Sequence, residues 1–349
     1  MKTKSLVFLF LSCLVSSSLL VSCSKKPATV RFEKTILMDK IAGGWAGKMI
    51  GVAYGAPTEF KSLGKIIEDS IRWEPRQIEN AKWEDDLYVQ MTLLGVMDKY
   101  GMNADPKIFQ KLFAASRYRL WHANAQARKN YYDSIFPPQS GHPEFNYHAD
   151  DIDFQIEADY IGMICPGMPL YANEQADKIG HIMNYGDGVY GGAFVAAMYA
   201  EAFLQNDIAA IIDKALLSIP AESEYYKIVK DVISWHKQYP DDWKQTWRNL
   251  EDKWGHVDIC GAGIPYNIDA KLNGAYIVLG LLYGENDIDK TMEITTRCGQ
   301  DSDCNPSSAL GILGVINGFE AFPKSYKDVL ASLQDTLFSH TDYTLKKAV

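Results

Sequence analysis

The chain has 349 residues, of which 47% are hydrophobic, and a formal net charge of −9 at pH 7. This length suits one large domain or two modest ones. The negative charge argues against nucleic-acid binding, because the protein would approach phosphates against its own field. Metal cations and neutral or cationic substrates are better suited to it.

The N-terminus has the pattern of an export signal. Two lysines precede an apolar run over residues 5–20, and the following LVSC, which ends at Cys23, resembles a bacterial lipobox. We therefore expect a lipoprotein signal peptide over residues 1–22, a lipid on Cys23 and a tether over residues 23–34. A plain secretion signal or an uncleaved anchor is the alternative. The protein would face the periplasm or the cell exterior and contact the membrane through the lipid only.

The first helix of the remaining chain is expected over residues 39–57 and is rich in glycine. Its glycines recur at every fourth position, at Gly43, Gly47, Gly51 and Gly55. This spacing places them on one helix face, where another backbone can approach closely. Because glycine disfavours a helix, tertiary packing must compensate for the stripe.

The pattern stays helical along most of the chain. The apolar residues Leu87, Met91, Leu94 and Met97 mark one face of the next helix. Further helices are expected over residues 106–121, 191–204, 209–218, 223–238, 272–282, 288–296, 306–319 and 326–337. Strand-like alternation is scarce and no low-complexity linker divides the chain. We therefore predict one all-α domain over residues 35–340.

Two segments supply candidate substrate-binding residues. Residues 134–162, with three prolines, do not fit a helix, and long loops within compact domains are often functional. His148, Asp150 and Asp151 in this stretch could hold neutral hydroxyl groups. Asp187 and Tyr190 belong to a glycine-rich turn that opens a helix, and helix N-termini bind anions. A solvated acidic loop and a simple helix start are the alternatives.

Two acidic motifs each precede a helix. Glu84, Asp85 and Asp86 come before the second expected helix, and Asp301 and Asp303 come before a helix that is apolar nearly all round. Each motif could simply cap its helix, since carboxylates suit the positive end of the helix dipole. Adjacent carboxylates repel one another unless a cation or protons intervene, however. Oxygen donors of this kind suit Mg²⁺, Mn²⁺ or Ca²⁺. Metal binding and capping both remain open at this point.

Four blocks extend the pattern over residues 39–319. They read "DKIAGGWAGKMIGVAYGAPTEF", "WEDDLYVQMTLLGVM", "GDGVYGGAFVAAMYAEAF" and "GQDSDCNPSSALGILGVINGF". In this order they resemble the ADP-ribosylglycohydrolase family, of the dinitrogen-reductase-activating glycohydrolase type. The resemblance implies a compact, orthogonal all-α bundle with a centre of one or two metal ions, usually Mg²⁺ or Mn²⁺.

The resemblance also implies roles for particular residues. The metal ligands that it implies are Glu84, Asp85, Asp86, Asp301, Asp303 and Cys304. Cys304 stands where the family has a threonine, and it could pair with Cys298 or remain a buried thiol. Glu59 matches a catalytic glutamate of some members, and the metal-bound Asp86 is the other candidate for this role.

The substrate is less closely specified. The family's Gly-Asn-Gly-x-x-Met-Arg loop corresponds here to EADYIGMICPG, which lacks the arginine but offers Asp159 to a substrate. We therefore expect a metal-dependent hydrolase that cleaves an ADP-ribosyl-like or another ribo- or arabinofuranosyl linkage. The substrate would be a small molecule, a glycan or a nucleotide sugar. The alternative is a catalytically altered lipoprotein that keeps the fold and binds sugars or nucleotides. The oligomeric state is left open.

Overall fold

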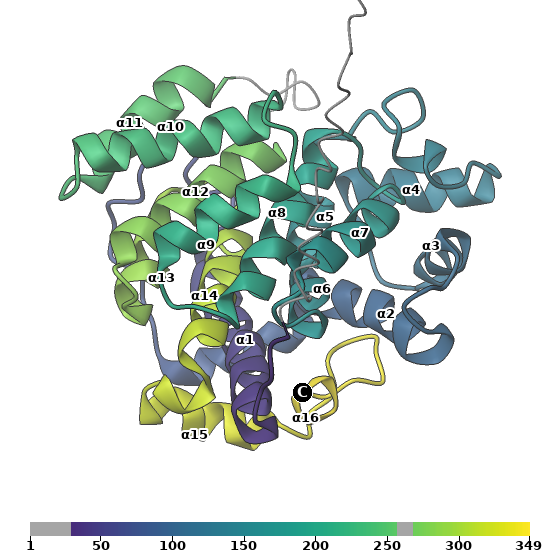
Figure 1. The fold of residues 1–349 in the computed structure, drawn as a ribbon, viewed down its shortest axis with the longest axis horizontal. Coiled ribbons are helices and arrows are strands. Elements are labelled where there is room, and N and C mark those ends of the chain that lie inside the picture. The colour runs from purple at the N-terminus through teal and green to yellow at the C-terminus, as the bar shows by residue number, and fades with distance from the viewer. Residues whose placement is uncertain (1–28, 257–267) are drawn as a thin grey trace, which may run out of the picture. The chain divides into compact units, whose positions relative to one another are not determined.

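The computed structural model describes residues 29–256 and 268–349, which fold almost entirely into α-helices (Figure 1). Within these residues β-structure is limited to two isolated bridges. The predicted all-α class is confirmed, and Phe32–Val349 form a single compact unit. No helix in the described part of the chain is long and apolar enough to cross a membrane. The predicted signal peptide and the lipid site at Cys23 lie outside the described residues.

The α-helices share a common order along the chain with the sequence blocks described above. They are α1 (Lys34–Gly55), α2 (Asp85–Tyr100), α3 (Pro106–Ala115), α4 (His122–Tyr132), α5 (Asp153–Glu157), α6 (Asp159–Ile164), α7 (Pro169–Gly180), α8 (Asp187–Ala202), α9 (Ile208–Ala215), α10 (Glu224–Gln238), α11 (Trp243–Trp254), α12 (Ala270–Gly284), α13 (Ile288–Arg297), α14 (Cys304–Asn317), α15 (Lys324–Leu333) and α16 (Leu345–Ala348). A long 3₁₀ helix, η2 (Pro75–Trp83), leads into α2.

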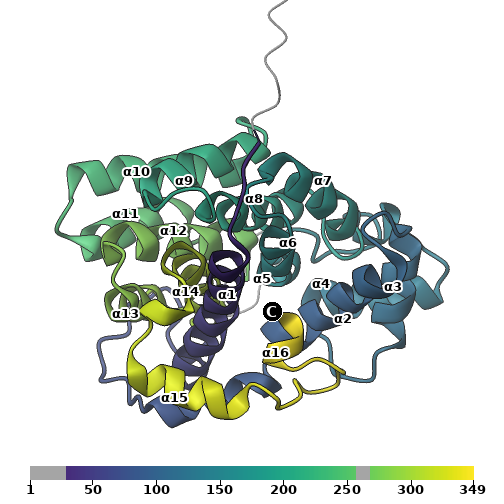
Figure 2. The same ribbon diagram turned by 60° about the horizontal axis from the view of Figure 1, so that its bottom comes forward.

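The innermost helices are α8, α12 and α14, in which nearly every residue is buried. Their sequences are apolar or small on all sides, as expected for helices that other helices surround. α14 contacts α1, α8, α12 and α13. Figures 1 and 2 both show it beside α1, in the interior of the bundle. The acidic motif that precedes α14 therefore also lies inside the protein.

The glycine stripe of α1 lies against the backbone of α14. A Cβ atom added at Gly47 would stand 2.0 Å from the carbonyl oxygen of Leu310, and one at Gly55 would stand 2.0 Å from that of Ser302. Such distances leave room only for hydrogen atoms, so the stripe fixes how closely the two helices approach. The sequence predicted this close contact, but not its partner. Gly55 places the end of α1 directly beside the second acidic motif.

We expect Gly47→Ala to destabilise the protein by about 3 kcal/mol or more, the upper range for overpacking, because the opposing atoms are backbone and cannot move aside. Gly95→Ala in α2 is the matched control. A Cβ there would meet nothing closer than 3.5 Å, from the ring of Tyr343. Its better helix propensity should leave stability unchanged or slightly improved. Equal denaturant midpoints for the two variants would contradict this account.

Three sequence-based boundaries were wrong. The helix predicted over residues 106–121 ends at Ala115, because Ser116 is extended and its hydroxyl donates to the carbonyl of Phe113 at 2.7 Å. A separate helix, α4, then starts at His122. Residues 134–162 become helical from Asp153 onward, in α5 and α6. α7 was not predicted, although Pro169 in its first turn is a common start signal.

Candidate active site

The two acidic motifs occupy the starts of helices but do not cap them. Glu84 is the N-cap residue of α2 and Asp303 is that of α14, yet neither side chain makes a capping hydrogen bond. By contrast, Asp105 caps α3 by accepting from the backbone N–H of Lys107 at 2.8 Å. Capping, the simpler interpretation of the motifs, therefore does not account for Glu84 or Asp303.

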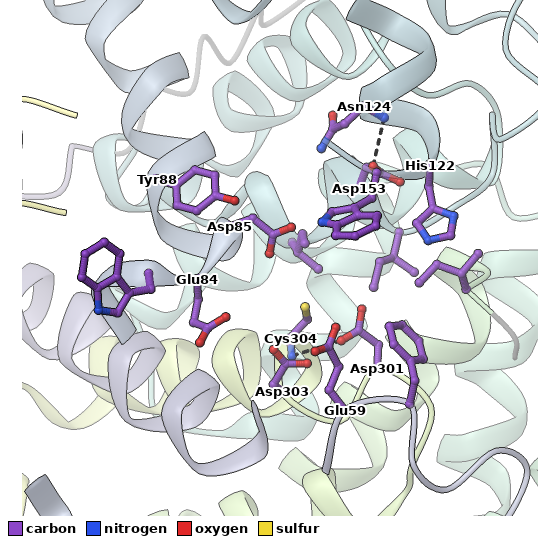
Figure 3. A pocket seen from close by; sticks show the side chains of 16 residues that line it. Glu59, Glu84, Asp85, Tyr88, His122, Asn124, Asp153, Asp301, Asp303 and Cys304 are labelled. Atoms are coloured by element: carbon purple, nitrogen blue, oxygen red, sulfur yellow. Dashed lines mark hydrogen bonds between the residues drawn. The ribbon is translucent and has the colours of Figure 1, made fainter. Parts of the chain in front are cut away.

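The motifs meet at a cavity of about 480 Å³ (Figure 3). Glu84 and Asp85 reach it from the start of α2, Asp301 and Asp303 from the start of α14, and Glu59 from the turn after α1. Figure 3 shows these carboxylates facing one another across the cavity. The other described residues that line it are Phe60, Trp83, Tyr88, Trp121, His122, Asn124, Ile152, Asp153, Ile156, Ile268 and Cys304.

Asp303 takes part in two groups of potential metal ligands. In one, its donor atom lies within 4.8 Å of those of Asp86 and Cys304, and in the other within 4.8 Å of those of Glu59 and Asp301. Oδ1 of Asp86 and Oδ1 of Asp303 are buried and have no hydrogen-bond partner. Because unsatisfied buried oxygens are costly, a bound cation would stabilise them. The oxygen donors therefore fit the Mg²⁺ or Mn²⁺ ion that the resemblance implies.

Cys304 is a thiol placed among carboxylates. Its Sγ donates to Oδ2 of Asp86 at 3.1 Å, and its backbone N–H donates to Oδ1 of Asp301 at 3.4 Å. Both Cys304 and Cys298 are free in the structure. Burial, and then the charge of Asp301, raise the pKa of the Cys304 thiol well above its usual range. The neutral thiol therefore serves as a hydrogen-bond donor to Asp86, and its soft sulfur is a poor ligand for Mg²⁺.

The crowding of carboxylates raises their pKa values. Desolvation, followed by the charges of Asp301, Glu84 and Asp86, raises the pKa of Glu59 to about 7. Desolvation and the charge of Asp86 raise the pKa of Glu84 to about 7. The pKa of Asp303 lies well above its usual value, through burial first and then the charge of Asp301. In the absence of a cation, protons therefore partly neutralise the cluster near neutral pH.

These shifts predict opposite effects of pH on the metal-free and metal-bound protein. Glu59 and Glu84 bind more protons in the folded state than in the unfolded state between their ordinary pKa of 4.5 and about 7. The metal-free protein should therefore lose stability as pH rises through this window. Metal ions must displace the same protons, so their apparent affinity should rise over it.

Melting temperatures with EDTA and with Mn²⁺, at about pH 5 and about pH 8, measure both trends. The control is the double variant Glu59→Gln/Glu84→Gln, in which the fall in metal-free stability should be smaller. A metal-free melting temperature that rises steadily across the window in the wild type, with no difference in the control, would contradict this assignment.

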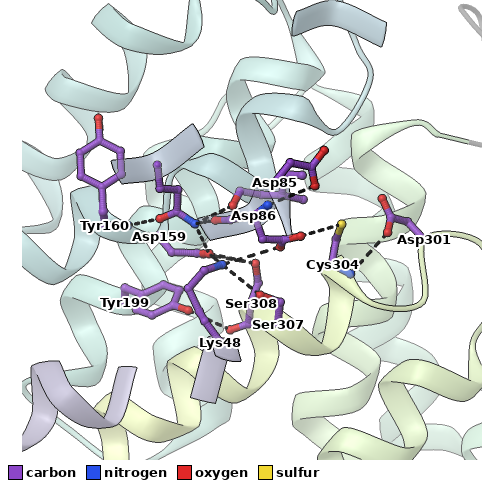
Figure 4. Close-up of polar contacts among 12 residues, drawn as sticks. Lys48, Asp85, Asp86, Asp159, Tyr160, Tyr199, Asp301, Cys304, Ser307 and Ser308 are labelled. Carbon is purple, nitrogen blue, oxygen red and sulfur yellow. Dashed lines mark hydrogen bonds and ion pairs between the residues drawn. The ribbon is translucent and has the colours of Figure 1, made fainter. Parts of the chain in front are cut away.

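A buried ion pair lies behind the cavity (Figure 4). Lys48 of α1 is fully buried and pairs with Asp159, and its Nζ lies 3.9 Å from Oδ1 of Asp86. Nζ also donates to Oγ of Ser307 at 3.1 Å, and Oγ of Ser308 donates to Asp159 at 3.2 Å. Asp159, predicted to contact substrate, instead neutralises Lys48 and does not line the cavity. The pair holds a positive charge beneath Asp86.

The other predicted substrate-binding residues also stand outside the lining of the cavity. Asp187 and Tyr190 begin α8 and are partly exposed. The backbone carbonyl of Asp150 accepts from the N–H of Ala270 at 2.9 Å. His148 and Asp151 lie together beside His122. None of these five is among the described residues that line the cavity.

The sequence did not single out several residues that do line it. Trp83 and Trp121 are 63% and 44% exposed, and they offer flat apolar surfaces at the cavity. His122 follows Trp121 directly and lines the cavity as well. Asp153 accepts from the backbone N–H of Asn124 at 3.0 Å and so fixes the start of α4. The only sequence signal for Trp83 was its position next to the first acidic motif.

Comparisons with known proteins agree with this arrangement. The family model described as ADP-ribosylglycohydrolase matches residues 33–347. Among solved structures, an "ADP-ribosylglycohydrolase-related protein complex" is similar, with a TM-score of 0.57 and 17% sequence identity. The similarity covers 84% of this chain and 93% of that chain, and at this identity it concerns the fold alone. A search of curated proteins gave no match.

Proposed function

Because the chain belongs to the ADP-ribosylglycohydrolase family, whose members are glycohydrolases, we propose that it is a metal-dependent hydrolase that cleaves a furanosyl glycosidic bond in the carboxylate-lined cavity. The observation that carries this proposal is the meeting of two uncapped acidic motifs. Their buried oxygens on Asp86 and Asp303 lack hydrogen-bond partners. A structural role in capping would have satisfied them.

Asp86, Asp301 and Asp303 are the residues that would hold the metal, with Glu59 and Cys304 at its edge. When bound, Mg²⁺ or Mn²⁺ supplies a Lewis acid that holds and polarises oxygen groups. Lys48 lies 3.9 Å from Asp86 and keeps this carboxylate in place from behind. Cys304 orients the other oxygen of Asp86 through its thiol hydrogen bond.

Glycoside hydrolysis needs one carboxyl group to take a proton from the attacking water and another to give a proton to the leaving oxygen. Glu59 extends to the carboxylate cluster from a turn outside both acidic motifs and is suited to accept the proton of water. Glu84 and Asp85 stand across the cavity (Figure 3) and are suited to protonate the leaving group. The anomeric carbon would lie between them.

The walls of the cavity favour an uncharged substrate. Trp83, Tyr88 and Trp121 provide aromatic surfaces for a sugar ring or a base. The described lining residues include no lysine or arginine, and the carboxylates give this lining a negative charge. A pyrophosphate would find no cationic side chain among them. We therefore propose a neutral ribo- or arabinofuranoside, from a glycan or a nucleoside, ahead of an ADP-ribosyl linkage.

A substrate panel tests the proposal. Chromogenic ribo- and arabinofuranosides, nucleosides and an ADP-ribosylated peptide would be incubated with the protein in Mg²⁺, in Mn²⁺ and in EDTA, with matched pyranosides as controls. Release of a furanose that EDTA abolishes is the expected result. Hydrolysis of the ADP-ribosyl bond alone would overturn the choice of a neutral substrate. Saturable sugar binding without turnover would support the non-catalytic alternative.

A further inference from the structure

Two histidines and a buried aspartate form a second cluster beside the cavity, made of His122, His148 and Asp151. Nδ1 of His148 lies 2.7 Å from Oδ2 of Asp151, and Nδ1 of His122 lies 3.4 Å from the same oxygen. One donor atom from each residue lies within 4.8 Å of the others. The two imidazole rings stand edge to face, 5.2 Å apart. We refer to these three residues as the imidazole cluster.

The polar atoms of this cluster are buried but not satisfied. Asp151 is 0% exposed, and neither of its carboxylate oxygens has a hydrogen-bond partner. Nδ1 of His148 is also buried without one, although it stands close to Asp151. The close contact is therefore not aligned as a hydrogen bond. A buried carboxylate left in this condition is costly, and a cation bound by the three donors would remove the cost.

Buried amides hold the two segments of the cluster in place. The side-chain N–H₂ of Asn146 donates to the carbonyl of Ala123, next to His122, at 3.0 Å. That of Asn184 donates to the backbone carbonyl of Asp151 at 2.7 Å. His122 also has a backbone φ of 37°, a conformation that is costly for a residue other than glycine and that is often found at functional sites. The donors are thus positioned in advance.

We propose that the imidazole cluster binds a divalent transition-metal ion of the Zn²⁺ type, separate from the carboxylate centre. Two imidazole nitrogens and one carboxylate oxygen are typical donors for Zn²⁺, whereas Mg²⁺ prefers oxygen alone. The imidazoles are 18% and 14% exposed, so an ion can reach them from solvent. Three protein ligands leave a coordination position for water or for a substrate group.

The position of the cluster gives this ion a role in the cavity. His122 lines the cavity, together with Asn124 and Asp153 on the same wall. Figure 3 shows His122 on the side of the cavity away from Glu84. An ion held by His122 would therefore lie at the edge of the substrate space. There it can hold a hydroxyl or phosphate group of the part of the substrate distant from the cleaved bond.

Direct metal measurements separate this site from the carboxylate centre. Asp303→Asn protein, freed of metal with EDTA and then dialysed against Zn²⁺, should retain one Zn²⁺ ion per chain by mass spectrometry of its metal content. Adding His148→Gln or Asp151→Asn should lower Zn²⁺ affinity by at least about tenfold. Co²⁺ in place of Zn²⁺ should give a visible absorption spectrum that these additions remove.

His181→Gln is the matched control, because Nδ1 of His181 lies 3.7 Å from Asp177 in a pair without a third donor. Circular dichroism of the metal-free variants checks that each one folds. Equal Zn²⁺ content and affinity in the Asp303→Asn protein with and without His148→Gln would overturn the proposal, leaving the cluster as an ion pair only. The readout does not depend on hydrolysis, so failure of the proposed glycosidase activity would leave it intact.

Discussion

Asp303→Asn should abolish metal-dependent stabilisation and lower kcat/KM by about 10³-fold or more. Asp303 belongs to both groups of metal ligands, and it is 3% exposed with one oxygen that has no hydrogen-bond partner. Asparagine keeps the shape but removes the charge that would hold the cation. The loss of several kcal/mol of transition-state stabilisation from a metal corresponds to a rate effect of this size. A thermal-shift titration with Mn²⁺ and initial rates on the best substrate measure both effects.

Asp105→Asn is the control for this variant. Asp105 is an ordinary helix cap, and asparagine caps about as well as aspartate. Its metal response and activity should match those of the wild type. Because Asp303 makes no capping bond, the metal-free Asp303→Asn protein should be at least as stable as the wild type, relieved of one buried charge. An active Asp303→Asn enzyme that still responds to Mn²⁺ would refute the site assignment.

Glu59→Gln should lower kcat by about 10²-fold to 10⁴-fold while leaving most of the metal-induced stabilisation. Glu59 is exposed, in contrast to the buried Asp86 and Asp303, and it approaches the cluster from its edge. Its turn is held to the second acidic motif by a backbone bond of 3.0 Å from the N–H of Phe60 to the carbonyl of Gln300. The amide therefore occupies the same position but cannot accept a proton from water.

The two readouts together assign the role of Glu59. A fall in kcat with a retained Mn²⁺ response indicates a proton acceptor, and a parallel loss of both indicates a metal ligand. Phe60→Leu, next to it in the same turn, keeps the carboxylate and should retain activity within about tenfold. A Glu59→Gln enzyme with unchanged kcat would remove Glu59 from the mechanism.

The sequence predicted the parts of the site that depend on local pattern. The acidic motifs were found because each precedes a helix, and helix starts bring short polar segments to defined positions. The glycine stripe predicted a close backbone contact, since four-residue spacing defines one helix face. That α14 fills this face, and brings Asp303 beside Gly55, depends on a tertiary contact that neither pattern contains.

The residues misjudged from sequence have functions set by distant partners. Asp159 lies in a segment that resembles a substrate loop, but its charge is taken up by Lys48 from α1. His148 and Asp151 were expected to face substrate, and they meet His122 instead. His122 itself has no motif around it, because its position depends on the sharp backbone turn before α4. In each case the partner is far away in sequence.

The pairing of α1 with α14 also determines when the protein can fold. The glycine face of α1 is completed only by a helix near the other end of the domain, so its burial requires loop closure over most of the chain. Contacts of such long range slow folding and leave partly made chains without a stable core. A chain truncated before Cys304 would lack the surface that covers α1. Commitment to the native state therefore comes late in synthesis, and a nascent chain of this protein stays competent for handling in an unfolded form.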